Sequence, residues 1–203
     1  MSTLSLGAEE LDDLTYYART GDLDALKATI THISSSYSCP QDTVLAATLD
    51  EDDDKPELSS GCCLLHWPAA NGNEAILSYL LSLLSSKPDS TGGPVKSTST
   101  LINHRNKNGN TPLHWAAVNG HLPCVKALVN AGADPLITNN AGHDALYEAD
   151  SSAKEGGREV AEWILANCAG LEKVSNGEVT GAETVAQDEG EADDLMDDLT
   201  NET

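Results

Sequence analysis

The chain repeats its own sequence, and this repetition limits the folds that it can adopt. Gly109 and Gly142 are 33 residues apart, and the sequence around each of them is similar. Further upstream, the letters LHW at residues 65–67 recur at residues 113–115, which is a spacing of 48 residues. Periods of this length are typical of proteins in which short units stack on their neighbours. We therefore expect a linear array of units, each burying a modest face.

The most regular unit identifies the kind of repeat. Residues 106–136 read NKNGNTPLHWAAVNGHLPCVKALVNAGADPL and contain the T-P-L-H-x-A core of the ankyrin repeat. Pro112 suits the first position of a helix, where its missing N–H costs nothing, and Gly120 permits the left-handed turn that ends this helix. Apolar residues at helical spacing follow between residues 122 and 129. The pattern predicts an all-α, ankyrin-repeat solenoid of helix-turn-helix units.

The register predicts about four units in a domain of residues 1–171. They begin near residues 8, 58, 106 and 139. Two insertions interrupt the period, at about residues 34–60 and 85–105. The first contains the acidic run DEDDD and the second is rich in Ser, Thr, Gly and Pro, so both are predicted to be mobile loops.

Two units depart from the regular pattern. Pro68 falls about five residues into the first helix of the second unit, which predicts a short or kinked helix. In the fourth unit, residues 153–157 occupy the place of a tight turn, so we expect its two helices to be spaced differently. Outer units of repeat arrays are commonly atypical, and neither departure argues against the array.

The charge limits the partners. The formal net charge is −22 over 203 residues, which disfavours DNA, RNA and anionic membranes and favours a basic protein. Solubility alone is the alternative reason for such acidity. The five cysteines are irregularly spaced, the start of the chain lacks a secretory signal, and the apolar run at 76–84 is too short to span a bilayer. We expect a soluble protein of the cytoplasm and nucleus.

No catalytic motif is recognisable, and we expect no enzyme, cofactor or metal site. His66 and His114 recur in register, which favours hydrogen bonds to neighbouring backbone over a role as bases. Cys62 and Cys63 precede His66, but no second Cys/His pair completes the four ligands that zinc requires. Neither a Ser–His–Asp order nor a phosphate-binding glycine loop is present.

The expected binding surface is the concave face of the array. Trp67 and Trp115 occupy equivalent positions, either as anchors for a partner or as ordinary packing between repeats. Other candidates stand at positions that vary between ankyrin units and face the concave side. The predicted concave-face residues are Arg19, Thr20, Trp67, Asn71, Lys107, Asn108, Asn110, Trp115, Val118, Asn119, Asn140, His143, Tyr147, Glu148, Ser151 and Ser152.

Residues 172–203 form a second candidate surface. They hold eleven acidic residues and one lysine, Lys173, and are predicted to be a disordered tail. Near the end, pairs of acids flank two apolar side chains, a pattern suited to a basic surface with an apolar patch; a purely solvating tail is the alternative. The predicted contact residues of the tail are Asp193, Asp194, Leu195, Met196, Asp197 and Asp198.

Several stretches resemble one particular family. NGNT followed by LHWA, the Ala133-Asp134-Pro135 turn, GHDA at residues 142–145, the opening ARTGDLDALK and the acidic end are similar to the fungal ankyrin-repeat chaperones of ribosome biogenesis. The resemblance covers about residues 8–171 in register. These proteins escort the KH-domain ribosomal protein of the small-subunit head, ribosomal protein S-three.

The resemblance implies a chaperone that binds this newly made, basic protein, keeps it soluble and accompanies it to the nucleus. Because repeat arrays with polar caps are usually monomeric, we expect a monomer. A generic ankyrin adaptor or inhibitor and an acidic histone chaperone remain as alternatives. An adaptor would bind its partner through the groove and would not need the tail. A histone chaperone would prefer histones to the ribosomal protein.

Overall fold

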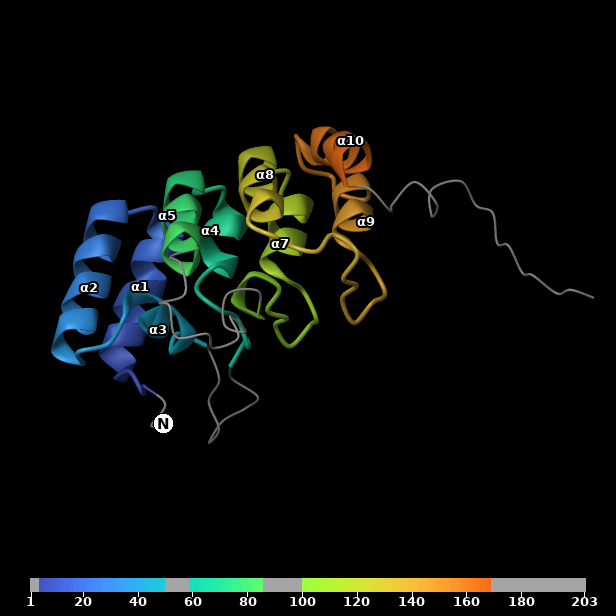
Figure 1. Ribbon diagram of the computed structural model, residues 1–203. Coiled ribbons are helices and arrows are strands. Elements are labelled where there is room, and N and C mark those ends of the chain that lie inside the picture. Colours follow the sequence, from blue (N-terminus) through green and yellow to red (C-terminus); the bar gives the residue numbers. More distant parts are fainter. Residues whose placement is uncertain (1–3, 50–58, 86–99, 169–203) are drawn as a thin grey trace, which may run out of the picture.

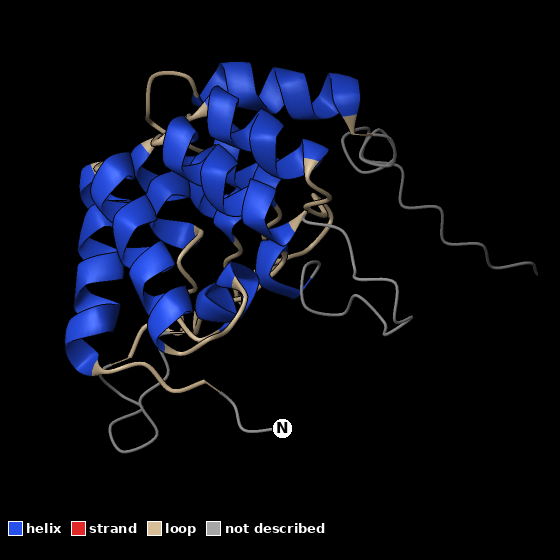
Figure 2. Ribbon diagram, turned by 60° about the vertical axis from the view of Figure 1, so that its left-hand side comes forward, coloured by secondary structure: helices blue, strands red, loops and turns tan. Residues whose placement is uncertain are grey.

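The computed structural model describes residues 4–49, 59–85 and 100–168 of the chain. Within these residues the secondary structure consists of helices joined by turns, and no strand is present (Figure 2). The helices stack side by side into an elongated array (Figure 1). The predicted all-α solenoid is therefore confirmed for the described residues.

Most helices are paired in two layers. The first layer holds the opening helix of each unit, and the second layer holds the closing helix (Figure 1). The pairs are α1 (Ala8–Thr20) with α2 (Leu23–Ser36), α4 (His66–Asn71) with α5 (Glu74–Leu84), α7 (Pro112–Val118) with α8 (Leu122–Asn130), and α9 (Ala145–Asp150) with α10 (Gly157–Asn167).

Local sequence explains where these helices begin and end. The carboxylates of Asp22 and Asp144 accept hydrogen bonds from backbone N–H groups three residues later, at 3.0 and 2.8 Å, and so cap α2 and α9. Gly21 and Gly72 end α1 and α4 with positive φ angles of 92° and 75°, a conformation that costs glycine little.

A continuous apolar core lies between the layers. Leu26 and Ile30 of α2, Leu77 and Leu80 of α5 and Leu128 of α8 are all fully buried. They stand at helical spacing on one face of each helix, so each unit covers the apolar stripe of the next. None of the described helices is long and apolar enough to cross a lipid bilayer.

The first insertion differs from the predicted mobile loop. Residues Gln41–Ala46 form a short helix, α3, which packs against α2 and α5 and buries Val44 and Leu45. The apolar sequence VLAATL at 44–49 indicates a buried element. The loop was predicted because a run of acidic residues follows it. That run, at residues 50–54, lies outside the described residues.

The second insertion is also partly ordered. Residues 100–102 are helical, and Leu101 and Ile102 are buried in the common core. Two adjacent large aliphatic side chains lose contact with water here, which stabilises this end of the insertion. Residues 86–99 lie outside the described residues, so the prediction of a loop there is untested.

Pro68 lies in a less restrictive place than the register predicts. Helix α4 begins at His66, whereas the equivalent helix α7 begins two positions earlier in the register, at Pro112. Pro68 is therefore the third residue of α4, in the first turn, where backbone N–H groups have no partner within the helix. The helix is short, as predicted, because it starts late.

The last unit has the wider spacing that its sequence predicts. Residues 151–156 connect α9 to α10, whereas residues 119–121 suffice between α7 and α8. Gly120 and Gly156 meet in this region. An added Cβ at Gly120 would lie 2.5 Å from the backbone oxygen of Glu155, so the long connection packs directly on the turn of the preceding unit.

Candidate functional site

Two histidines join neighbouring units. Nδ1 of His66 accepts a hydrogen bond from the backbone N–H of Cys63 at 3.2 Å, and its Nε2 lies 3.0 Å from the carbonyl oxygen of Asn110 in the next unit. His114 repeats the arrangement, with Thr111 N–H at 3.2 Å and the His143 carbonyl oxygen at 3.1 Å. Each neutral imidazole thus accepts on one nitrogen and donates on the other.

The burial of these rings favours their neutral form. Loss of water around His66 lowers its pKa to about 4, and burial also lowers the pKa of His114. Both rings are therefore uncharged near pH 7. The contacts of His66 and His114 confirm the structural role that was predicted from their recurrence.

The buried cysteines have the properties of packed thiols. All five are free, and burial raises the pKa of Cys63 and of Cys124 to about 12. Thiols with such values stay protonated at neutral pH and are poor nucleophiles and metal ligands. Among the described residues, no group of three or more His, Cys, Asp or Glu side chains is placed to hold a metal ion.

The two predicted aromatic anchors pack on each other. The rings of Trp67 and Trp115 meet edge to face with their centroids 5.6 Å apart, and the Arg19 guanidinium lies 4.9 Å from the Trp67 ring centroid. Both indoles are half-buried. Packing between repeats is thus part of their role, while a role as anchors for a partner stays a prediction.

Some predicted contact residues bridge the units instead of projecting freely. The Nδ2 atom of Asn71 donates to the carbonyl oxygen of Arg19 at 2.9 Å, and Nδ2 of Asn140 donates to that of Lys107 at 2.8 Å. These amides satisfy backbone groups of the neighbouring unit. Both side chains remain exposed at their edges, so they join two units and still border the surface.

The fourth unit gathers another predicted group. The rings of His143 and Tyr147 stack with centroids 3.9 Å apart, and Nδ1 of His143 lies 3.3 Å from Oε1 of Glu148. The same oxygen accepts a hydrogen bond from Asn139 at 2.8 Å. Tyr147 keeps half of its surface exposed, which leaves an aromatic face open to solvent.

The remaining predicted residues of the concave face are distributed along the array and form no single cluster. Ser152 donates from Oγ to the carbonyl oxygen of Val118 at 2.6 Å, and Asn119 donates from Nδ2 to that of Trp115 at 2.9 Å. The exposed members are Thr20, Lys107, Asn108 and Ser151, and the half-buried ones are Asn110, Val118, Asn119 and Ser152. Their role in binding stays a prediction.

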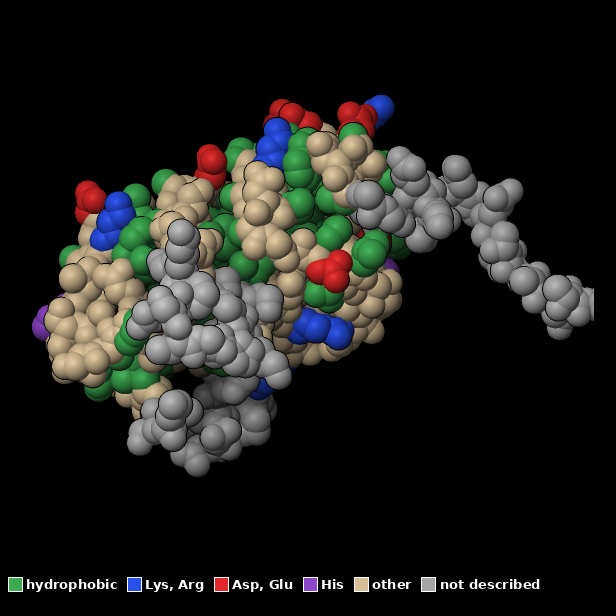
Figure 3. Space-filling model, viewed as in Figure 1, with side chains coloured by type: hydrophobic (Ala, Val, Ile, Leu, Met, Phe, Trp, Pro, Cys, Tyr) green, Lys and Arg blue, Asp and Glu red, His purple; other side chains and the backbone are tan. Residues whose placement is uncertain are grey.

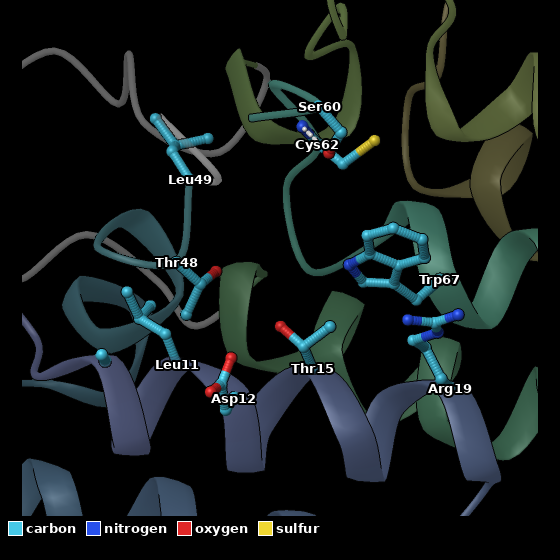
Figure 4. A pocket seen from close by; sticks show the side chains of 10 residues that line it. Leu11, Asp12, Thr15, Arg19, Thr48, Leu49, Ser60, Cys62 and Trp67 are labelled. Atoms are coloured by element: carbon cyan, nitrogen blue, oxygen red, sulfur yellow. Dashed lines mark hydrogen bonds between the residues drawn. The ribbon is translucent and has the colours of Figure 1, made fainter. Parts of the chain in front are cut away.

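The sequence did not predict a hollow between the first and second units. Its volume is about 500 Å³, and it opens beside the exposed face of α1 (Figure 4). Three segments that are distant in the sequence contribute to it. The lining residues are Ala8, Leu11, Asp12, Thr15, Arg19, Thr48, Leu49, Ser60, Cys62 and Trp67.

Of these lining residues, the sequence interpretation included Arg19 and Trp67 as contact candidates. Thr48, Leu49, Ser60 and Cys62 were missed because they belong to, or adjoin, the insertion taken for a mobile loop. The hollow combines apolar walls with two charges of opposite sign, Asp12 and Arg19. Such a mixture suits a side chain with an apolar stem and a charged head better than it suits a catalytic reaction.

The acidic charge is unevenly distributed. Eleven of the 33 acidic residues lie in 172–203 and six lie in 50–57, and both stretches are outside the described residues. On the face seen in Figure 3, the charged side chains of the described residues stand singly or in small groups among apolar and neutral ones. The predicted tail contacts, Asp193–Asp198, therefore remain a prediction.

Comparison with known proteins places this array in a family. The family described as ankyrin repeats (3 copies) matches residues 13–139 and 95–176. The chain belongs to the ankyrin-repeat family. The ankyrin-repeat-containing protein YAR1 of Saccharomyces cerevisiae is 38% identical over 151 residues, which cover 74% of this chain and 66% of YAR1. The chain thus spans just under two thirds of the length of that relative.

A solved structure extends the match to the fold. The crystal structure of the yeast ribosomal protein Rps3 in complex with its chaperone Yar1 matches with a TM-score of 0.64 and 35% identity, covering 79% of this chain and 94% of the matched chain. The predicted resemblance to an ankyrin-repeat chaperone is confirmed by these two matches, which agree on the same yeast protein.

Other relatives share the repeats alone. The palmitoyltransferase Hip14 of Drosophila melanogaster is 36% identical over 84 residues, and human palmitoyltransferase ZDHHC13 is 34% identical over the same length. These matches cover 41% of this ankyrin-repeat chain and 11% of each enzyme. They support the ankyrin fold and carry no argument for a transferase activity.

Proposed function

We propose that this ankyrin-repeat protein is a dedicated chaperone of a newly made, basic small-subunit ribosomal protein, the counterpart of yeast Rps3. It keeps this client soluble and escorts it during ribosome assembly. The match to Yar1, in sequence and in fold, carries the proposal, because it extends over 94% of a chain solved with that chaperone's client.

Electrostatics support the same client. A chain with a net charge of −22 attracts a strongly basic protein, accelerates the encounter and competes with RNA for exposed Lys and Arg side chains. The attraction is screened by salt, so binding is expected to weaken as the ionic strength rises. Escort from synthesis to assembly implies presence in both cytoplasm and nucleus, and we include this localisation in the proposal.

Binding, and not catalysis, is the proposed activity. The recurring histidines use both ring nitrogens in the junctions between units, so their imidazoles serve the scaffold. The proposed chaperone acts as a monomer without a cofactor and without direct contact to nucleic acid or membrane.

The test is a direct binding measurement with purified components. The full chain and a version ending after Leu171 are titrated with Rps3 and with core histones, at about 0.1 M and about 0.5 M salt, where screening lengths differ by roughly twofold. We expect selective, salt-sensitive binding of Rps3. Comparable binding of histones supports a histone chaperone instead, and binding of neither supports a generic ankyrin adaptor. The truncated chain shows whether residues 172–203 contribute.

A further inference from the structure

One carboxylate at the hollow, that of Asp12, has no ion-pair partner within the part of the chain that the structure describes. Figure 4 shows Asp12 and Thr15 rising from α1 toward the hollow, while Arg19 lies farther along the helix against Trp67. The ion pairs among the described residues involve Glu148 and Glu162, and none involves Asp12. Asp12 is exposed, so its charge is available to a bound molecule.

The apolar walls of the hollow are suited to a long aliphatic stem. Leu11, Leu49 and Trp67 contribute apolar surface to the hollow. Lysine and arginine side chains pack their methylene groups on such surface while their charged heads remain near a carboxylate and water. A volume of about 500 Å³ exceeds that of one such side chain and leaves space for the adjoining backbone.

The arrangement of charge favours a cation at the Asp12 end. Arg19 is the cation among the lining residues, and it stands two helical turns away, or about 10 Å along α1 at 1.5 Å per residue. Its guanidinium already lies over the Trp67 ring. An incoming cation next to Asp12 is therefore separated from the positive end of the hollow.

The sequence that follows one lining residue of the hollow, Leu49, is strongly acidic. Leu49 and Ser59 are the described residues on either side of residues 50–58, and Leu49 and Ser60 both line the hollow. The sequence between them contains six acidic residues and one lysine. The hollow itself is built from described residues alone.

We propose that the hollow receives one Lys or Arg side chain of the client, with the Asp12 carboxylate as its ion-pair partner. Leu11, Leu49 and Trp67 contact the aliphatic stem. This inference rests on the proposed function, which supplies a basic client, and adds the place where one of its basic side chains is recognised. Asp12 is then a specificity-determining residue of the first unit.

Asp13 provides a matched control. It is also exposed and adjacent on the same helix, but it lies in the separate groove formed with Glu9, Glu10 and His32. The experiment titrates the full chain and the variants D12N, D12R, D13N and D13R with purified Rps3. We expect affinity to fall about fivefold for D12N, because the partly desolvated ion pair with the client is lost. It should fall at least about thirtyfold for D12R, because a like charge then repels the client's cation. Both Asp13 variants should stay within about twofold.

The outcomes separate this inference from the function on which it rests. If wild type does not bind Rps3, the proposed function fails and the inference fails with it. If wild type binds but the Asp12 and Asp13 variants lose affinity equally, the overall negative charge explains binding. The hollow is then not the binding site of a Lys or Arg side chain. The loss in D12N should shrink at high salt. D12N preserves side-chain size at an exposed position, so it carries the test if D12R unfolds.

Discussion

Two junctions of the first helical layer are built differently. Between α4 and α7, the His66 imidazole reaches the Asn110 carbonyl of the next unit and the two tryptophan rings pack edge to face. Between α1 and α4, the hollow occupies the corresponding space, and the side chain of Asn71 joins the two units at one end. The junction between α4 and α7 is therefore closed, whereas the junction between α1 and α4 is open.

The register explains the open junction. Thr15 of α1 stands where His66 and His114 stand in the later units, and Cys62 stands where Asn110 does. A threonine side chain is too short to reach the next unit as the imidazole does. Thr15 and Cys62 accordingly line opposite sides of the hollow. The loss of one motif residue thus leaves a space that a ligand can enter.

The strongest test of the closed junction removes its imidazole. His66→Ala should reduce the free energy of unfolding by about 4 kcal/mol, because it leaves a cavity and removes the partner of one buried and one partly buried backbone group. The exposed His32 on α2 is the control, and His32→Ala should change stability by less than about 0.5 kcal/mol. Urea unfolding measures both. Equal effects would show that the bridge contributes nothing.

The same histidine should make stability depend on pH. Its folded-state pKa of about 4 is below the unfolded value of 6.5, so the unfolded chain binds a proton first as the pH falls. The contribution of His66 to the free energy of unfolding is complete above about pH 6.5 and is lost as the pH falls toward 4. Between pH 7.5 and 5 it should decrease by about 2 kcal/mol.

Because carboxylates also titrate on acidification, the His66 contribution has to be isolated. The urea unfolding of wild type and His66→Gln is therefore compared at both pH values, since the carboxylates are common to both chains. Between pH 7.5 and 5, the free energy of unfolding should decrease by about 2 kcal/mol more in wild type than in His66→Gln. Parallel pH profiles for the two chains would contradict the assignment to His66.

Close packing between the third and fourth units predicts a loss of stability on substitution of Gly120 that is smaller than the loss for His66→Ala. Gly120→Ala places a Cβ 2.5 Å from a backbone oxygen in addition to the strain of a φ angle of 73°. Gly142→Ala has a φ angle of 80° but meets no atom within 4 Å, so it reports strain alone. The first variant should be less stable than the second by about 2 kcal/mol in chemical denaturation. A difference near zero would mean that the turn shifts freely.

The smallest change converts the open junction into a closed one. Thr15→His should let the imidazole hydrogen-bond toward Cys62, as its counterparts do in later units, and stabilise the fold by about 1 kcal/mol. It should also fill part of the hollow and weaken the binding of Rps3. Thermal unfolding and titration measure the two effects. Unchanged affinity in a stabilised variant would argue against the hollow as a binding place.

Local sequence patterns account for the scaffold of this protein. The T-P-L-H unit and its 33-residue register predicted the helix pairs, the role of His66 and His114 and the family, because each depends on local patterns that recur. A different helix spacing in the last unit was also predicted, whereas α4 is short because it begins late and not because Pro68 interrupts it. The predicted acidic tail, residues 172–203, lies outside the described residues.

Contacts between distant segments depend on the tertiary fold. The hollow joins α1, the end of the first insertion and Trp67, and no spacing in the sequence indicates that Leu49 and Ser60 approach Asp12. Burial of Val44 and Leu45 turned an expected loop into a packed helix, since apolar side chains gain more from contact with the core than from water. Asn71 and Asn140 bridge the units because backbone carbonyls of a neighbouring unit lie within hydrogen-bonding distance of their side chains. Contacts of this kind depend on the three-dimensional arrangement of distant segments, which a one-dimensional repeat does not encode.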